Sequence, residues 1–161
     1  MNERAISFGE SGALFGILGA PEIPDPSRPA VLIPNTGVMH RVGPSRMHVE
    51  LARALAAAGV VSLRIDHAGL GDSEPVPGRS DTTTRELSAA MDALDARNIS
   101  SGYVVIGSHS GAHDAHQAAR IDPRIVDWEA GLVSTQTEQL LVTSDGARNE
   151  QCWHQTIPWP K

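Results

Sequence analysis

The sequence predicts an α/β fold, built on a mostly parallel sheet with helices on both faces. Three observations support this prediction. Short apolar runs, typical of buried strands, alternate with amphipathic helical patterns along the chain. Glycine or proline separates most of these patterns from one another. The helical patterns are long enough to serve as crossovers between parallel strands, which place helices on both faces of a sheet.

The first third of the chain predicts a hairpin, a buried strand and a helix. Two short runs between residues 5 and 19 flank a turn rich in glycine and serine, which is a hairpin signal. Residues 31–33 form a short apolar run typical of a buried strand. We expect a helix over residues 45–58, with Gly59 ending it.

The middle of the chain repeats the pattern of strand and helix. Residues 60–65 predict a second buried strand. Thr83 and Glu86 then have the spacing of a capping box at the start of a helix. Apolar residues recur on one face of this helix, at Leu87, Ala90, Met91 and Leu94.

The last patterned part begins with a third buried strand at residues 103–106, which we expect near the centre of the sheet. A turn of small residues and a helix to Arg120 follow. Asp122 and Pro123 end that helix, because the residue before a proline disfavours helical geometry. Residues 125–133 hold one more candidate strand.

Composition narrows the class of protein. The chain has 161 residues, enough for one domain, with 40% hydrophobic and 20% charged residues. Its net charge of −6 argues against nucleic-acid binding. One cysteine, Cys152, allows no internal disulfide and fits a reducing compartment. Without a signal peptide or membrane-spanning run, we expect a cytoplasmic protein that needs no cofactor and binds a small-molecule substrate, not a membrane.

The turn after residues 103–106 is the strongest functional signal. A sharp turn from strand to helix holds its central residue in strained geometry and needs small residues two positions away on either side. Ser110 at the centre would have Ser108 and Ala112 as these neighbours. This register is favoured because a hydroxyl is the usable nucleophile.

The alternative elbow position is His109, whose neighbours two residues away are Gly107 and Gly111. These are the better small residues, but they place an imidazole where a nucleophilic hydroxyl or thiol is expected. His113 follows His109 by four residues, and His116 follows His113 by three, a spacing that places side chains on one face of a helix. Histidines on an exposed helix are usually only solvated, so no metal site is expected.

Two further motifs accompany this turn. Residues 35–46 contain the pattern G-x-x-H-R-x-G-P-x-R, and residues 63–73 read L-R-x-D-x-x-G-x-G-D-S. With the turn, they resemble the α/β-hydrolase superfamily, and within it the bacterial branch of exosortase- or exopolysaccharide-associated hydrolases. The resemblance covers residues 3–133. That branch often has Gly-x-Cys-Ser-Gly at the turn, where this chain has His109 in the place of cysteine.

The resemblance implies a serine hydrolase that cleaves an ester, thioester or amide by acyl transfer. Ser110 would be the nucleophile, and the backbone amides of Gly111 and Val38 would bind the oxyanion. Asp145 and His154 follow in the order that the family's acid and histidine have. The alternative is a catalytically inactive hydrolase-like chain that acts by association.

The end of the chain departs from the family. We divide the chain into a hydrolase core at residues 1–133 and a divergent tail at residues 134–161, with one candidate strand at residues 140–142. The C-terminal part of the fold is therefore expected to be missing. The strand after Asp122 would then be an edge. We expect the chain to form a homodimer through that edge, to pair it with residues 140–142, or to be marginally stable.

Overall fold

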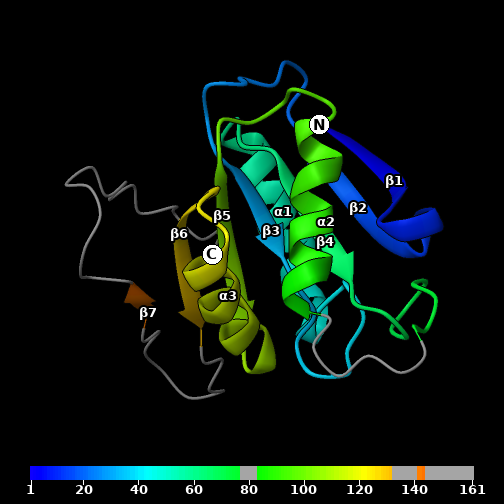
Figure 1. Cartoon of the computed structure of the whole chain (residues 1–161). Helices are drawn as coiled ribbons and strands as arrows, with labels where there is room; N and C mark the ends of the chain where they lie inside the picture. Colours follow the sequence, from blue (N-terminus) through cyan, green and yellow to red (C-terminus); the bar gives the residue numbers. More distant parts are fainter. Residues whose placement is uncertain (77–82, 132–140, 144–161) are drawn as a thin grey trace.

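The computed structural model describes residues 1–76, 83–131 and 141–143. These residues form a sheet with the strand order β1-β2-β4-β3-β5-β6-β7, flanked by helices (Figure 1). The strands are β1 (Asn2–Phe8), β2 (Leu14–Ala20), β3 (Ala30–Ile33), β4 (Ser62–Asp66), β5 (Tyr103–Ser108), β6 (Ile125–Gly131) and β7 (Leu141–Thr143).

The centre of the sheet is parallel. β3 pairs in parallel with β4 and β5, and β5 pairs in parallel with β6. β1 and β2 form the expected antiparallel hairpin, and β2 also lies antiparallel to β4. The mostly parallel α/β fold predicted from the sequence is confirmed. β5 lies inside the sheet between β3 and β6, and its carboxyl end therefore meets those of the neighbouring strands at one edge of the sheet.

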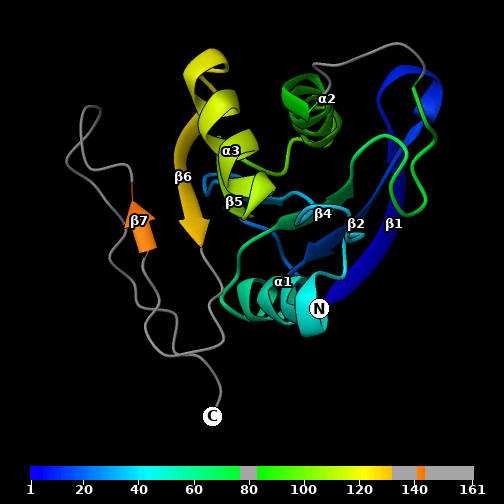
Figure 2. The ribbon, with the colours of Figure 1, turned by 90° about the horizontal axis from the view of Figure 1, so that it is seen from below.

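Helices cover both faces of the sheet, as predicted. α1 (Met47–Ala57) lies on one face, while α2 (Thr83–Asp95) and α3 (Ser110–Ile121) lie on the other (Figure 2). Short 3₁₀ turns occupy Glu10–Gly12 and Pro44–Arg46. Side chains alternate across β3, so that Leu32 belongs to the larger core beneath α2 and α3, while its neighbours pack toward α1.

Local signals in the sequence explain the helix boundaries and faces. Gly59 ends α1 with a φ of 80°, and its amide donates to the Ala56 carbonyl at 3.1 Å. The Val60 amide donates to the Leu55 carbonyl at 2.9 Å, which completes a Schellman motif. The predicted apolar face of α2 is fully buried, at Leu87, Ala90, Met91 and Leu94.

The edge of β6 is paired in the structure. β7 runs antiparallel to β6, with Glu129 opposite Thr143 and Gly131 opposite Leu141. Pairing of this edge with the segment near residues 140–142 was one of the three expectations for it. Most of the tail lies outside the described residues, so the division of the chain at residue 133 stays a prediction. No helix among the described residues combines the length and apolar character that crossing a membrane requires.

Candidate active site

The turn between β5 and α3 is centred on His109. This residue has φ 52° and ψ −117°, a combination of backbone angles that residues other than glycine rarely adopt. A Cβ atom on Gly107 would lie 2.0 Å from the Gly111 carbonyl oxygen, and one on Gly111 would lie 2.7 Å from the Asn35 carbonyl oxygen. Only glycine fits at these two positions, which are the required neighbours of a sharp turn at His109.

The observed register therefore differs by one residue from the favoured one. Ser110 is the first residue of α3, and His109 occupies the strained position. The preference for Ser110 followed from the chemistry of its hydroxyl, whereas the backbone obeys the steric demand for glycine at both flanking positions. The signal that identifies the register was already in the sequence, in the pair Gly107 and Gly111.

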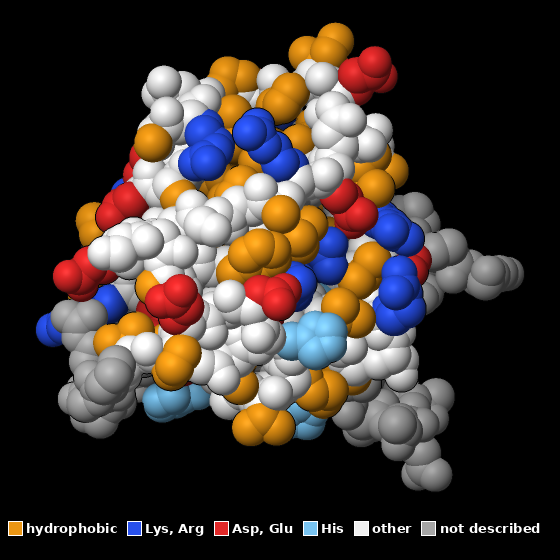
Figure 3. All heavy atoms as spheres, turned by 90° about the vertical axis from the view of Figure 1, so that its right-hand side faces the viewer, with side chains coloured by type: hydrophobic (Ala, Val, Ile, Leu, Met, Phe, Trp, Pro, Cys, Tyr) orange, Lys and Arg blue, Asp and Glu red, His pale blue; other side chains and the backbone are white. Residues whose placement is uncertain are grey.

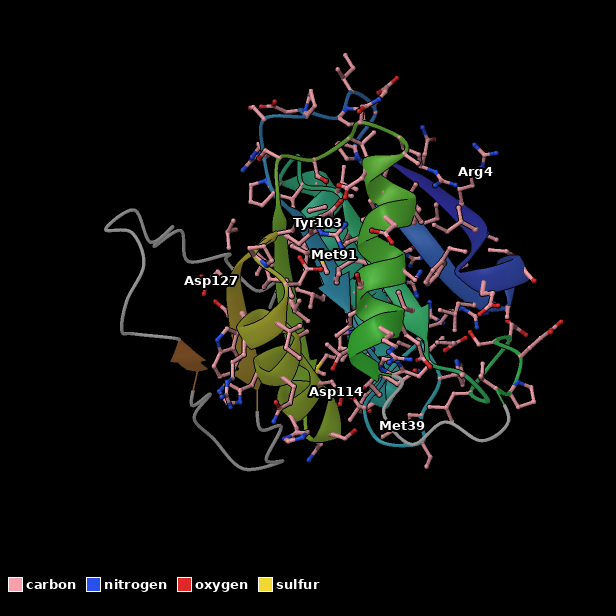
Figure 4. The ribbon with its side chains drawn as sticks, in the orientation of Figure 1. Arg4, Met39, Met91, Tyr103, Asp114 and Asp127 are labelled. Atoms are coloured by element: carbon pink, nitrogen blue, oxygen red, sulfur yellow. The ribbon has the colours of Figure 1, made fainter. Side chains whose placement is uncertain are left out.

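Ser110 faces the loop after β3. Its Oγ accepts a hydrogen bond of 2.8 Å from the Gly37 amide. The residue is exposed at the edge of the sheet where the parallel strands end. Met39, which is labelled in Figure 4, lies in the same loop, and its amide donates to the Thr36 carbonyl at 3.1 Å.

A buried chain of polar side chains fixes this loop to the end of β5. The hydroxyl oxygens of Thr36 and Ser108 lie 2.5 Å apart, and Thr36 Oγ1 lies 3.2 Å from Nε2 of His48. All three residues are buried. Val38 projects from the loop and is 87% exposed, and its amide has no hydrogen-bond partner in the part of the chain that the structure describes.

His48 anchors this chain on α1. Burial, together with the positive charge of Arg64, lowers the pKa of His48 to about 4, so the imidazole is neutral at pH 7. The ring packs directly on Gly43, where a Cβ atom would lie 2.5 Å from the ring. The glycine of the G-P pair in the first motif therefore makes room for the imidazole.

Asp66 joins the two sequence motifs. Its buried carboxylate accepts a hydrogen bond of 2.6 Å from the Arg41 amide and forms an ion pair with the Arg41 guanidinium. It also accepts hydrogen bonds from Asn35 Nδ2 at 3.1 Å and from the Asp72 amide at 3.2 Å. A Cβ atom on Gly71 would lie 2.1 Å from Asp66 Oδ2. These residues support the two loops beside the turn.

A second buried polar cluster lies between the end of β4 and the helices above it. Nδ1 of His67 lies 2.7 Å from Oε2 of Glu86, which also accepts a hydrogen bond from the Ala68 amide at 3.2 Å. Nε2 of His67 lies 3.8 Å from Oδ2 of Asp114, the residue labelled on α3 in Figure 4. The spacing of Glu86 suggested only a helix cap, because its contact with His67 is set by the fold.

The remaining predicted catalytic residues fall beyond the part of the chain that the structure describes. Asp145 and His154 lie outside the described residues, so their part in a triad stays a prediction. Within the described ranges, no group of three histidine, cysteine or acidic side chains has an arrangement that could hold a metal ion. The ring of His116 packs against Trp128 instead, with the ring centroids 5.1 Å apart.

The face of the molecule that carries the β1–β2 hairpin has mixed charge. Figure 3 shows positive and negative side chains interspersed on the face that includes the β1–β2 hairpin. Histidine side chains appear in the lower part of this view, the level at which β3, β4 and β5 end in Figure 1. His67 and His109 directly follow β4 and β5, so two imidazoles stand at the carboxyl ends of these strands, where open α/β sheets bind their ligands.

Comparison with known proteins identifies the fold. No family model and no curated protein matches the chain. Two esterases and an α/β hydrolase of known structure match it with TM-scores above 0.6. An esterase from Pyrococcus furiosus has a TM-score of 0.62 and 20% identity, covering 77% of this chain and 46% of its own. A cold-adapted esterase from an Arctic intertidal metagenomic library has a TM-score of 0.63 and 21% identity, covering 81% of this chain and 60% of its own.

The described residues thus have the α/β-hydrolase fold. The α/β hydrolase GrgF from a Penicillium species agrees, with a TM-score of 0.62 and 20% identity over 81% of this chain and 45% of its own. The chain spans between 46% and 60% of the lengths of the two esterases. At these identities the likeness defines the fold alone, and membership of the exosortase-associated branch stays a hypothesis.

Proposed function

We propose that the chain carries a hydrolytic acyl-transfer site at the carboxyl end of β5 and cleaves an ester, thioester or amide. The observation that carries this proposal is the strained turn at His109, which exposes two reactive side chains, His109 and Ser110, opposite the loop after β3. Two of the structural relatives with this fold are esterases.

Acyl transfer also needs donors for the negative charge that develops on the carbonyl oxygen. With the turn at His109, the amide that follows the turn residue belongs to Ser110, in place of the Gly111 amide expected from the other register. The amides of Ser110 and Val38 have no hydrogen-bond partner among the described residues. These two amides are the proposed oxyanion donors, and Val38 keeps the role that the family resemblance implies.

The family pattern implies a catalytic triad for this proposal. In that triad Ser110 would be the nucleophile, Asp145 the acid and His154 the base. A serine hydroxyl needs a neighbouring base to take its proton during attack.

A second candidate function is binding without catalysis. It is favoured by the replacement of serine or cysteine with His109 at the strained position.

The test measures hydrolysis of p-nitrophenyl acetate and phenyl thioacetate by the full chain and by the double variant His109→Ala/Ser110→Ala. We expect turnover above the buffer rate, falling at least about tenfold in the double variant, because both reactive side chains are removed. His113→Ala is the matched control, since it removes another exposed imidazole, one that α3 carries. A folded wild-type chain without turnover would favour binding alone.

A further inference from the structure

We infer that His109 is itself the attacking group, and that the site accepts aryl esters and thioesters. This inference rests on the proposed function and names its nucleophile and substrate class. His109 is exposed, and its imidazole makes no hydrogen bond, ion pair or ring contact in the described part of the chain. By contrast, His48 and His67 are buried and bonded to neighbouring side chains.

The backbone holds His109 against its conformational preference. A residue other than glycine in such geometry costs on the order of 1–3 kcal/mol, and surrounding contacts must maintain it. Here Gly107 and Gly111 allow the close approach of backbone segments. The hydrogen bond between the hydroxyls of Ser108 and Thr36 holds the end of β5 against the loop after β3. The imidazole is therefore carried at a rigid turn in the position that this fold uses for its nucleophile.

Ser110 is less suited to attack in the described arrangement. Its Oγ already accepts a hydrogen bond from the Gly37 amide, which draws electron density away from the oxygen. No histidine or carboxylate among the described residues contacts this hydroxyl. A neutral imidazole needs no base, because one ring nitrogen carries a lone pair that is available for attack.

The reaction proceeds in two steps. The unprotonated nitrogen of His109 attacks the acyl carbon, a C–N bond forms, and the C–O or C–S bond breaks as the aryloxide or thiolate leaves. The imidazolium then loses its N–H proton to water or to the leaving group. Water attacks the acyl-imidazole, the C–N bond breaks, and a carboxylic acid and the neutral imidazole are released. The sum is hydrolysis, with no oxidant or reductant consumed.

This nucleophile sets the substrate class. Imidazole leaves a tetrahedral intermediate more readily than an alkoxide or an amide anion does, so intermediates formed from alkyl esters and amides return to the starting compound. Aryloxides and thiolates are more stable anions and leave in competition with imidazole. The site is therefore expected to cleave aryl esters and thioesters but not ethyl esters or peptides.

The experiment compares the full chain with His109→Asn, His109→Gly and Ser110→Ala. Asparagine and glycine tolerate positive φ, so these substitutions preserve the turn while removing the nucleophile. We expect both His109 variants to lose p-nitrophenyl acetate turnover at least about tenfold, and Ser110→Ala to lower it less than either His109 variant does. The control His113→Asn removes another exposed imidazole and should retain turnover within about threefold. Circular dichroism melting checks that each variant folds. Ethyl acetate should not be hydrolysed.

Alkylation gives an independent readout. An α-bromoketone, 2-bromoacetophenone, forms a stable C–N bond with the attacking nitrogen, which peptide mass spectrometry locates. We expect alkylation at His109 in preference to the exposed His113. Turnover that persists in His109→Asn and disappears in Ser110→Ala would overturn this inference and leave the proposed function standing. Absence of turnover in the wild-type chain would overturn the proposed function itself.

Discussion

His48 shows how one buried residue couples the site to the solvent pH. Its side chain is buried beside Thr36, whose hydroxyl meets both His48 and Ser108. Burial lowers the pKa of His48 from 6.5 to about 4. The unfolded chain therefore binds a proton at this residue between pH 6.5 and 4, whereas the folded chain does not.

Stability should consequently fall as the pH drops through this window, with no further loss from this residue below about pH 4. We expect His48 to contribute about 2–3 kcal/mol to the difference in the free energy of unfolding between pH 7 and pH 4.5. Urea unfolding of the wild type and His48→Gln at both values measures it. The variant should be less stable at pH 7 but less sensitive to acid. His113→Gln is the control, and equal acid sensitivity in His48→Gln would refute the prediction.

At the scale of an element, the unit of β5, turn and α3 depends on close contact between backbones. A Cβ atom on Gly107 would collide with the backbone of Gly111 and Ala112. The backbone atoms of a helix start cannot move aside as the end of a flexible side chain can. No other segment approaches Gly37 in this way, because a Cβ atom there would meet nothing within 4 Å.

These two glycines provide a matched comparison. Gly107→Ala should lower the free energy of unfolding by at least about 3 kcal/mol, because the helix start must shift to admit the methyl group. Gly37→Ala should cost only about 1–2 kcal/mol, since the strain of its positive φ is the only penalty. Urea denaturation followed by circular dichroism measures both. Equal losses would mean that the collision at Gly107 is relieved elsewhere.

At the scale of the whole molecule, the edge of the sheet at β6 is closed by β7. The antiparallel pairing covers residues 129–131 of β6. An uncovered strand edge presents unpaired amides and carbonyls that can pair with another chain. Homodimerisation through this edge is therefore proposed for a chain that lacks β7.

Truncation after Gly131 tests this role. The shortened chain should either dimerise or melt at a lower temperature, because β6 loses its antiparallel neighbour. Size-exclusion chromatography with light scattering gives the mass, and thermal unfolding gives Tm. A truncated chain that stays monomeric with an unchanged Tm would show that the edge needs no cover.

The sequence by itself determined the elements and their order. The apolar runs at β3, β4 and β5, and the stripe from Leu87 to Leu94, were predicted because burial imposes a periodicity on neighbouring residues. The α/β-hydrolase fold followed from this order and from the motifs in the loops after β3 and β4. The region of the candidate site was predicted with them, since strands that run in parallel end at one edge.

The tertiary structure decided between the two registers of the turn that the sequence left open, and it alone showed what the neighbouring residues contact. His109 takes the strained position because Gly111 packs on the Asn35 carbonyl, a contact between segments far apart in sequence. Glu86 meets His67 for the same kind of reason, although its spacing suggested a helix cap. Periodicity records which side of an element is buried, whereas the register of a turn and the partner of a buried charge depend on the segments that pack against them.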